Sequence, residues 1–363
     1  MKKTIYANEG ASIFIISLCV ANILATLLVS LVQGLGDFEG MAIMSWVSYA
    51  LIQIMFIVAA IVYSAVRKIN VPAVTRMNKG LKPLQYVLLP LIAVATILVF
   101  LPLANAWSAF LTVIKFHASA PSMPMTSKVW VYFLALFIMA VMPAFGEEIL
   151  MRGFTLHGTS TRGVWFGILI SSALFSLMHA NPVQTVHQFG LGLVLAIVVA
   201  SSGSIWGAVI LHFLNNFIAL TLTTYLPQVD AWYVQLGYWN WLTGAGSVIV
   251  GLVLLVILLY LFYLAGNKDN EPKFKVVSGG IEYDEVSIYA HEEEEKKSNL
   301  FVDTFRFFGS LFTKAGWQNI TRALTRSNEI ETTGKEQNVL GVWLALGIVA
   351  LYWIIALVRG FIA

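Results

Sequence analysis

The stretch that decides the fold is residues 129–152, VWVYFLALFIMAVMPAFGEEILMR, where 18 uncharged residues lead directly into two glutamates and then an arginine. A helix needs about 20 mostly apolar residues to cross the hydrocarbon core of a bilayer. Ionisable residues inside such a helix are costly, and they usually mark functional sites. The stretch therefore predicts a membrane-spanning helix that carries a pair of carboxylates.

The composition of the whole chain agrees with this interpretation. Hydrophobic residues make up 58% of the 363 residues and charged residues only 11%, whereas soluble proteins average about 25% charged residues. The same composition excludes a typical nucleic-acid-binding protein, and the lone Cys19 excludes an intramolecular disulfide. We predict an all-α, polytopic transmembrane helix bundle that has membrane lipid, and no nucleic acid, as a partner.

Eight further stretches of the chain lack charged residues and predict additional spans. They are Ala11–Gln33, Met41–Val66, Pro83–Ile114, Val164–Ala180, Phe189–Ser201, Ser204–Leu222, Trp241–Gly266 and Asn338–Val358. Phe189–Ser201 is short, so the prediction is eight or nine spans. The first stretch is too long for the hydrophobic region of a signal peptide, and we expect a permanent anchor there.

These spans divide the chain into five parts. We expect N-terminal spans in residues 1–128, a central core in 129–224, a further span in 225–266, a hydrophilic segment in 267–337 and the last span in 338–363. The hydrophilic segment carries 13 of the 19 acidic residues. Within it, apolar residues recur along Leu300–Leu324 as in a helix that lies in the membrane interface or packs on the bundle. Its role stays open.

The positive charges set the expected orientation. With nine spans, 19 of the 22 lysine and arginine residues fall on one side of the membrane, and only Lys115, Lys128 and Arg359 fall on the other. Positive charges concentrate in cytoplasmic loops. We therefore predict a multi-pass protein of the cell membrane with its N-terminus and residues 267–337 in the cytoplasm.

Five polar residues in the central core are candidates for chemistry, because a polar side chain inside a span is costly. Any one of them alone could be a polar residue that bonds two packed helices. Together, on three neighbouring apolar segments, they favour a site. They are Glu147, Glu148, His179, His212 and Asn216.

Helical spacing assigns different roles to these residues. Residues four apart share a face of a helix, whereas neighbours point about 100° apart. Glu148 can therefore pair with Arg152, which makes this carboxylate structural. Glu147 has no lysine or arginine three or four residues further along the chain. It is therefore the better candidate for a general base. His212 and Asn216 share a face and can serve one site together.

These residues resemble the three motifs of the CPBP family of intramembrane endopeptidases, which comprises the CAAX proteases and the bacteriocin-processing, Abi-type bacterial proteins. The match lies in order and spacing, and it covers roughly Val129–Leu222, a quarter of the chain. The N-terminal spans and residues 267–337 lie outside it. The matching motifs are Glu147-Glu148-x-x-x-Arg152, Phe175-x-x-x-His179 and His212-x-x-x-Asn216.

The resemblance implies hydrolysis of a peptide bond in a membrane-associated peptide or protein. The residues matching Glu147 and His179 would activate a water molecule. Those matching His212 and Asn216 would stabilise the oxyanion of the tetrahedral intermediate. The residues that would hold these catalytic groups in place are Glu148, Arg152 and Phe175. The sequence leaves the substrate and the oligomeric state open.

One alternative concerns a metal at the site, and two concern the function. Glu147, His179 and His212 form a ligand set that zinc could use, but Asn216 beside His212 suits hydrogen-bond donation better, so we favour chemistry without a metal or cofactor. A non-catalytic Abi-type regulator or bacteriocin self-immunity protein would use the same core for binding. A transporter with a proton relay would also need these residues, but it predicts paired half-repeats, which the sequence does not show.

Overall fold

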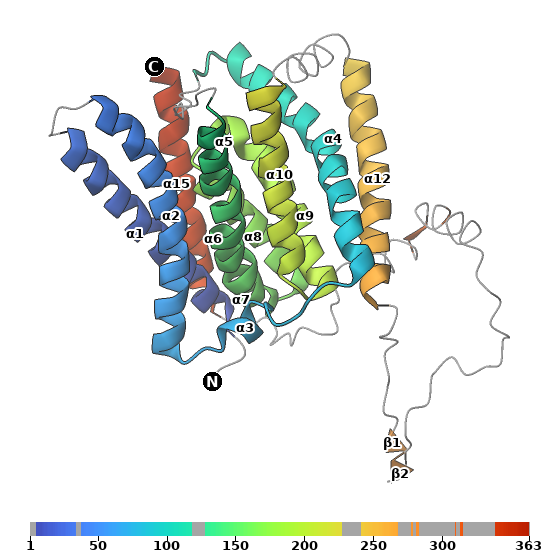
Figure 1. Ribbon diagram of the computed structural model, residues 1–363. Coiled ribbons are helices and arrows are strands. Elements are labelled where there is room, and N and C mark those ends of the chain that lie inside the picture. Colours follow the sequence, from blue (N-terminus) through green and yellow to red (C-terminus); the bar gives the residue numbers. More distant parts are fainter. Residues whose placement is uncertain are drawn as a thin grey trace.

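The structure is a computed structural model that describes residues 5–33, 38–117, 128–226, 241–267 and 338–362, together with a few isolated positions between 277 and 314. It confirms the all-α, polytopic bundle. Figure 1 shows the long helices standing side by side, with α1 (Ala7–Gln33) and α2 (Phe38–Arg67) at one edge of the bundle. The pair α4 (Pro83–Val113) and α12 (Trp241–Asn267) forms the opposite edge.

The central core lies between these edges and is built from shorter pieces. One continuous helical run contains α5, the π-helix η1, α6, the π-helix η2 and α7. Three further helices follow it, and the C-terminal helix packs against α1. The bounds are α3 Val71–Val74, α5 Val129–Leu136, η1 Phe137–Val141, α6 Met142–Glu148, η2 Ile149–Thr155, α7 Leu156–Ser160, α8 Val164–Met178, η3 Pro182–Gln184, α9 Thr185–Ser202, α10 Trp206–Tyr225 and α15 Leu340–Ile362.

Eight helices of the described residues are long and apolar enough to cross a membrane. The stretch expected to be short, Phe189–Ser201, belongs to a candidate span of 21 residues, Pro182–Ser202. The helix that falls short is α8, which has 15 residues. A two-residue antiparallel pair, β1 (Val277–Ser278) with β2 (Ile281–Glu282), lies outside the bundle.

The turn between α8 and α9 lies inside the bundle, which explains why α8 is short. The Trp107 indole donates a hydrogen bond to the Pro182 carbonyl at 2.7 Å, and the Trp353 indole donates to the Thr185 hydroxyl at 2.7 Å. These tryptophans precede the ends of α4 and α15 by six and nine residues, which is roughly 9 and 13 Å at 1.5 Å per residue. The polar turn is therefore recessed below the ends of its neighbours.

Contacts between helix ends show which ends share a side of the bundle. The Gly341 N–H donates to the Asn8 side-chain oxygen at 2.9 Å, so α15 begins beside the start of α1. Gly266, near the end of α12, packs on Gln85 at the start of α4. On the opposite side, the His117 N–H donates to the Gly360 carbonyl at 2.7 Å.

The segment 267–337 thus leaves and re-enters the bundle on the side where α1 begins, as the charge distribution predicts. That this side faces the cytoplasm stays a prediction. The expected amphipathic helix at Leu300–Leu324 lies outside the described residues, apart from three isolated positions.

Candidate active site

The two adjacent glutamates end α6, and π-helical segments lie directly before and after this short helix. A π-turn changes the direction in which the following side chains point, and such turns are frequent at functional sites. Glu147 is 7% exposed and Glu148 is fully buried. Both carboxylates therefore lie inside the bundle, where each needs polar partners.

Glu148 is the centre of a buried charged cluster. Its Oε1 accepts hydrogen bonds from Arg152 Nη1 at 3.0 Å and from His212 Nδ1 at 2.8 Å. Arg152, itself 2% exposed, also donates to the Gly192 carbonyl at 3.1 Å. The pairing of Glu148 with Arg152 matches the one that their spacing predicts. The bond from His212 joins α10 to α6, and the sequence does not predict it.

The Phe175 ring is surrounded by three of the candidate site residues. The Arg152 guanidinium carbon lies 4.5 Å from the ring centroid, a cation–π contact. The rings of His179 and His212 meet the Phe175 ring edge to face, with centroids 5.2 and 5.7 Å away. Phe175 therefore contacts both imidazoles and the buried guanidinium.

The tautomer of His179 follows from its hydrogen bond. Its Nδ1 lies 2.7 Å from the Phe175 carbonyl oxygen, which can only accept. Nδ1 therefore carries the proton, and in a neutral ring Nε2 presents a lone pair. His212 Nδ1 in turn donates to the Glu148 carboxylate. The two imidazoles thus offer their Nε2 atoms for chemistry.

Glu147 is held from a helix outside the core. Gln53 Nε2, from α2, donates a hydrogen bond to Glu147 Oε1 at 2.7 Å, and Gln53 is itself buried. A Cβ at position 146 would lie 2.7 Å from Gln53 Oε1 and 2.9 Å from the Gln53 carbonyl. Gly146 is therefore required for this close approach. Glu147 Oε2 is buried and makes no hydrogen bond within the described part of the chain.

Asn216 is anchored by a consequence of Pro143. Proline has no N–H, so it cannot donate to the carbonyl four residues earlier in its helix. That carbonyl belongs to Met139, and Asn216 Nδ2 donates to it at 3.0 Å. Asn216 Oδ1 in turn accepts from Asn215 Nδ2 at 3.3 Å. The Asn216 amide thereby holds α10 against η1, the segment that precedes the glutamates in the chain.

His187, at the start of α9, is a polar residue that the sequence analysis missed. It interacts with His179 and with the Asn215 side chain. Its Nδ1 is buried and has no hydrogen-bond partner among the described residues. Its position just before the predicted span Phe189–Ser201 concealed it, as the absence of charge in Met41–Val66 concealed Gln53. A search for amides and imidazoles inside the spans or next to their ends would have found both.

The structure brings most of the predicted residues together. Contacts join Glu148, Arg152, His212, Phe175 and His179 in one cluster. Glu147 is next to this cluster in the chain, but no hydrogen bond between described residues links it to His179. That these two share one cavity therefore stays a prediction.

The choice between zinc and chemistry without a metal stays a prediction. Across the described ranges, no group of three or more histidine, cysteine, aspartate or glutamate side chains is placed to hold a metal ion. His212 Nδ1 is engaged by Glu148 and His179 Nδ1 by a carbonyl. We derive no step through a metal.

The fold and the cluster together define a class, a polytopic membrane protein with a buried carboxylate–imidazole–guanidinium site. Residues 128–218 match a family model described as type II CAAX prenyl endopeptidase Rce1-like. The resemblance indicated by the three motifs is thus confirmed over these residues, which make up about a quarter of the chain. No curated protein and no solved structure matches the chain significantly.

Proposed function

We propose that this protein is an intramembrane endopeptidase that hydrolyses a peptide bond in a membrane-associated peptide or protein, of the CAAX or the peptide-processing type. The observation that carries the proposal is the state of Glu147. One carboxylate oxygen is held by Gln53, and the other is buried without a partner among the described residues. A buried acceptor of this kind needs an explanation, and a general base supplies one.

The acceptors of the site suit activation of a water molecule. Glu147 takes one proton of the water as its oxygen attacks the carbonyl carbon of the scissile bond. The second hydrogen of the same water is donated to the lone pair of His179 Nε2. The carbonyl π-electrons move to its oxygen, which becomes the oxyanion of a tetrahedral intermediate.

Two side chains of α10 suit stabilisation of that oxyanion. In its protonated form, His212 presents Nε2–H as a donor. Asn216 has a second amide hydrogen besides the one bound to Met139. Both donors would act on the oxyanion.

Collapse of the intermediate completes the reaction. The carbonyl reforms, the C–N bond breaks and Glu147 returns its proton to the departing amine. The sum is one water consumed and two peptide ends released. Glu148 and Arg152 take no proton in this scheme, and they act by orienting His212.

The test compares membrane proteomes from cells that carry the wild type or Glu147→Gln. We expect a peptide that only the wild type releases, with equal amounts of both proteins in the membrane. Glu9→Gln, a carboxylate-to-amide change at the start of α1 outside the cluster, is the matched control and should release the same peptide. Equal release by Glu147→Gln would contradict the proposal and favour a non-catalytic regulator.

A further inference from the structure

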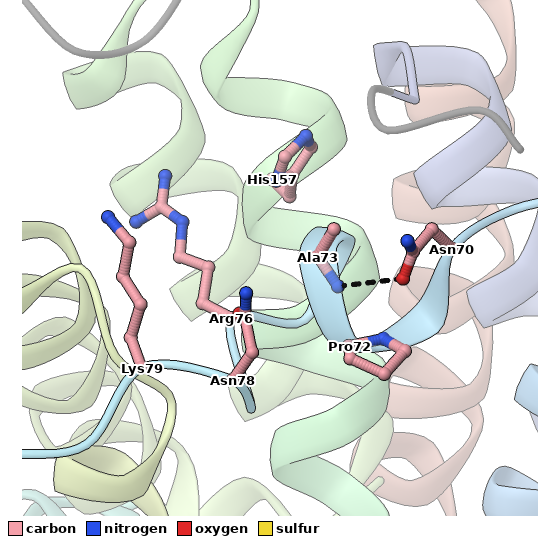
Figure 2. Close-up of a pocket in the computed structure, with 7 residues that line it drawn as sticks. All are labelled: Asn70, Pro72, Ala73, Arg76, Asn78, Lys79 and His157. Carbon is pink, nitrogen blue, oxygen red and sulfur yellow. Dashed lines mark hydrogen bonds between the residues drawn. The ribbon is translucent and has the colours of Figure 1, made fainter.

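A cavity separate from the glutamate site lies where α7 meets the loop between α2 and α4. Its volume is about 540 Å³. Figure 2 shows the Arg76 and Lys79 side chains extending from the loop, with His157 contributed by the neighbouring helical run. His157 follows Glu148 by nine residues, which is roughly 13 Å along the axis. The lining residues are Asn70, Pro72, Ala73, Arg76, Asn78, Lys79 and His157.

The chemistry of this lining favours an anion. Its two charged residues, Arg76 and Lys79, are both positive, and none of the seven lining residues is acidic. Asn78 adds an amide donor. The buried His157 Nδ1 has no hydrogen-bond partner in the described ranges. His157 uses its other ring nitrogen for a hydrogen bond with the Val74 backbone, so it adds no donor to this set. An anionic group with several acceptor oxygens matches this set of donors.

The backbone that presents these side chains is held in place. The Trp206 indole donates to the Met77 carbonyl at 3.0 Å, and the Ser204 hydroxyl donates to the Lys79 carbonyl at 2.6 Å. Directly before them, Arg76 adopts a left-handed backbone conformation with φ of 60°. That conformation is costly for a residue other than glycine and persists where the surroundings enforce it. The loop therefore offers its cations from a pre-formed turn.

The cavity lies at the level where the spans end. The candidate spans Ser45–Arg67 and Pro83–Val113 flank the loop, and His157 is three residues from the end of the span Val129–Ser160. This is the depth of lipid head groups, and basic pockets between transmembrane helices at this level bind anionic lipid head groups. The position favours a lipid phosphate over a phosphate free in solution.

From these observations we propose that this cavity binds the phosphate of an anionic phospholipid, with Arg76 and Lys79 as its charged contacts. Asn78 adds a hydrogen bond to a further oxygen. The site is distinct from the glutamate site, and the proposal does not depend on proteolytic activity. The bound lipid belongs to the membrane leaflet on the side of the bundle that carries the loop between α2 and α4.

The experiment titrates the purified full-length protein in detergent with phosphatidylglycerol, phosphatidylcholine or inorganic phosphate, and it counts bound molecules by native mass spectrometry. We expect one phosphatidylglycerol to bind more tightly than phosphatidylcholine, and inorganic phosphate to bind least. The variant Arg76→Asn with Lys79→Gln should lower the phosphatidylglycerol affinity roughly 30-fold, because it removes two cations. Asparagine is chosen because it tolerates the left-handed conformation.

The chain offers a closely matched control. Lys68 is also basic, exposed and left-handed, with φ of 53°, on the same side of the bundle but outside the cavity. Lys68→Asn with Lys82→Gln removes the same charge and should leave the affinity within about twofold, since no cavity contact is lost. Equal losses in both double variants would overturn the proposal in favour of general surface attraction.

Three further results would each contradict the binding of a lipid phosphate in this cavity. Inorganic phosphate that binds as tightly as phosphatidylglycerol would overturn the choice of a lipid. An increase in lipid affinity when Glu292–Glu295 are changed to glutamine would show that the acidic run of this chain occupies the cavity instead. Asn78→Asp keeps the loop and adds a negative charge, so unchanged lipid binding by this variant would also contradict the site.

Discussion

Gln53 Nε2 lies 2.7 Å from Glu147 Oε1, so an amide from α2 holds the candidate base that ends α6. The two residues are 94 positions apart, and Gln53 is outside the segment 128–218 that matches the protease family. The N-terminal spans therefore contribute directly to the site. A hydrogen bond to a charged group contributes about 1.5–3 kcal/mol, so this bond can orient the carboxylate.

Gln53→Met, which keeps the size of the side chain but cannot donate, should lower kcat about tenfold and leave KM nearly unchanged. Gln85→Met is the matched control, because Gln85 is a buried amide that donates to the Phe262 carbonyl away from the site. An unchanged kcat in Gln53→Met would argue against this role.

Glu148→Gln should reduce the amount of folded protein as well as activity, because Arg152 would then be a buried charge without its carboxylate. Losing one partner of a buried pair typically costs about 3–5 kcal/mol. Adding Arg152→Met removes the orphan charge and should restore abundance in part but not activity. Membrane abundance and thermal stability measure both effects. A stable, inactive Glu148→Gln beside an active Glu147→Gln would exchange the two roles.

Pro143→Ala should change the site through the backbone. Alanine supplies an N–H that can bond the Met139 carbonyl, which now accepts from Asn216. The new helical bond would compete with Asn216 and shift α10 relative to η1. We expect an unchanged or higher melting temperature together with a kcat lowered about tenfold, as displacement of catalytic groups by fractions of an ångström predicts. Unchanged kcat would separate Asn216 from catalysis.

Chelation tests the choice of a metal-free mechanism. The purified enzyme should keep its activity after exhaustive treatment with a chelator and should contain well under one zinc per chain. A zinc enzyme would lose activity under chelation and regain it when Zn²⁺ is added. Recovery of that kind would reverse our assignment of Glu147, His179 and His212.

A reporter fused after Gly280 tests the orientation. Positive charges on the side where α1 and α15 begin predict that this side faces the cytoplasm, so a reporter that works only in the cytoplasm should be active. A matched fusion after Phe361, at the opposite end of α15, should be inactive. Translocation of the first fusion would invert the bundle and place the Arg76 cavity in the outer leaflet.

Local sequence determined much of this protein. Whether a stretch can span a bilayer depends on its own length and apolarity, so the helical segments could be predicted one by one. The pairing of Glu148 with Arg152 could also be predicted, because residues four apart in one helix must lie on the same face. The matching family motifs identified the core for the same reason, since each motif falls within one helical segment or at its end.

Contacts between helices were decided only by the tertiary structure. The bonds from Gln53 to Glu147, from His212 to Glu148 and from Asn216 to Met139 depend on how each helix is rotated and how closely it approaches its neighbour. Periodicity within a helix does not fix either quantity. Here Gly146 allows α2 to approach α6 closely. Pro143 has no N–H for the Met139 carbonyl, which accepts from Asn216 of α10 instead. The depth of the turn between α8 and α9, which follows His179, likewise depends on where Trp107 and Trp353 of two other helices bond to it.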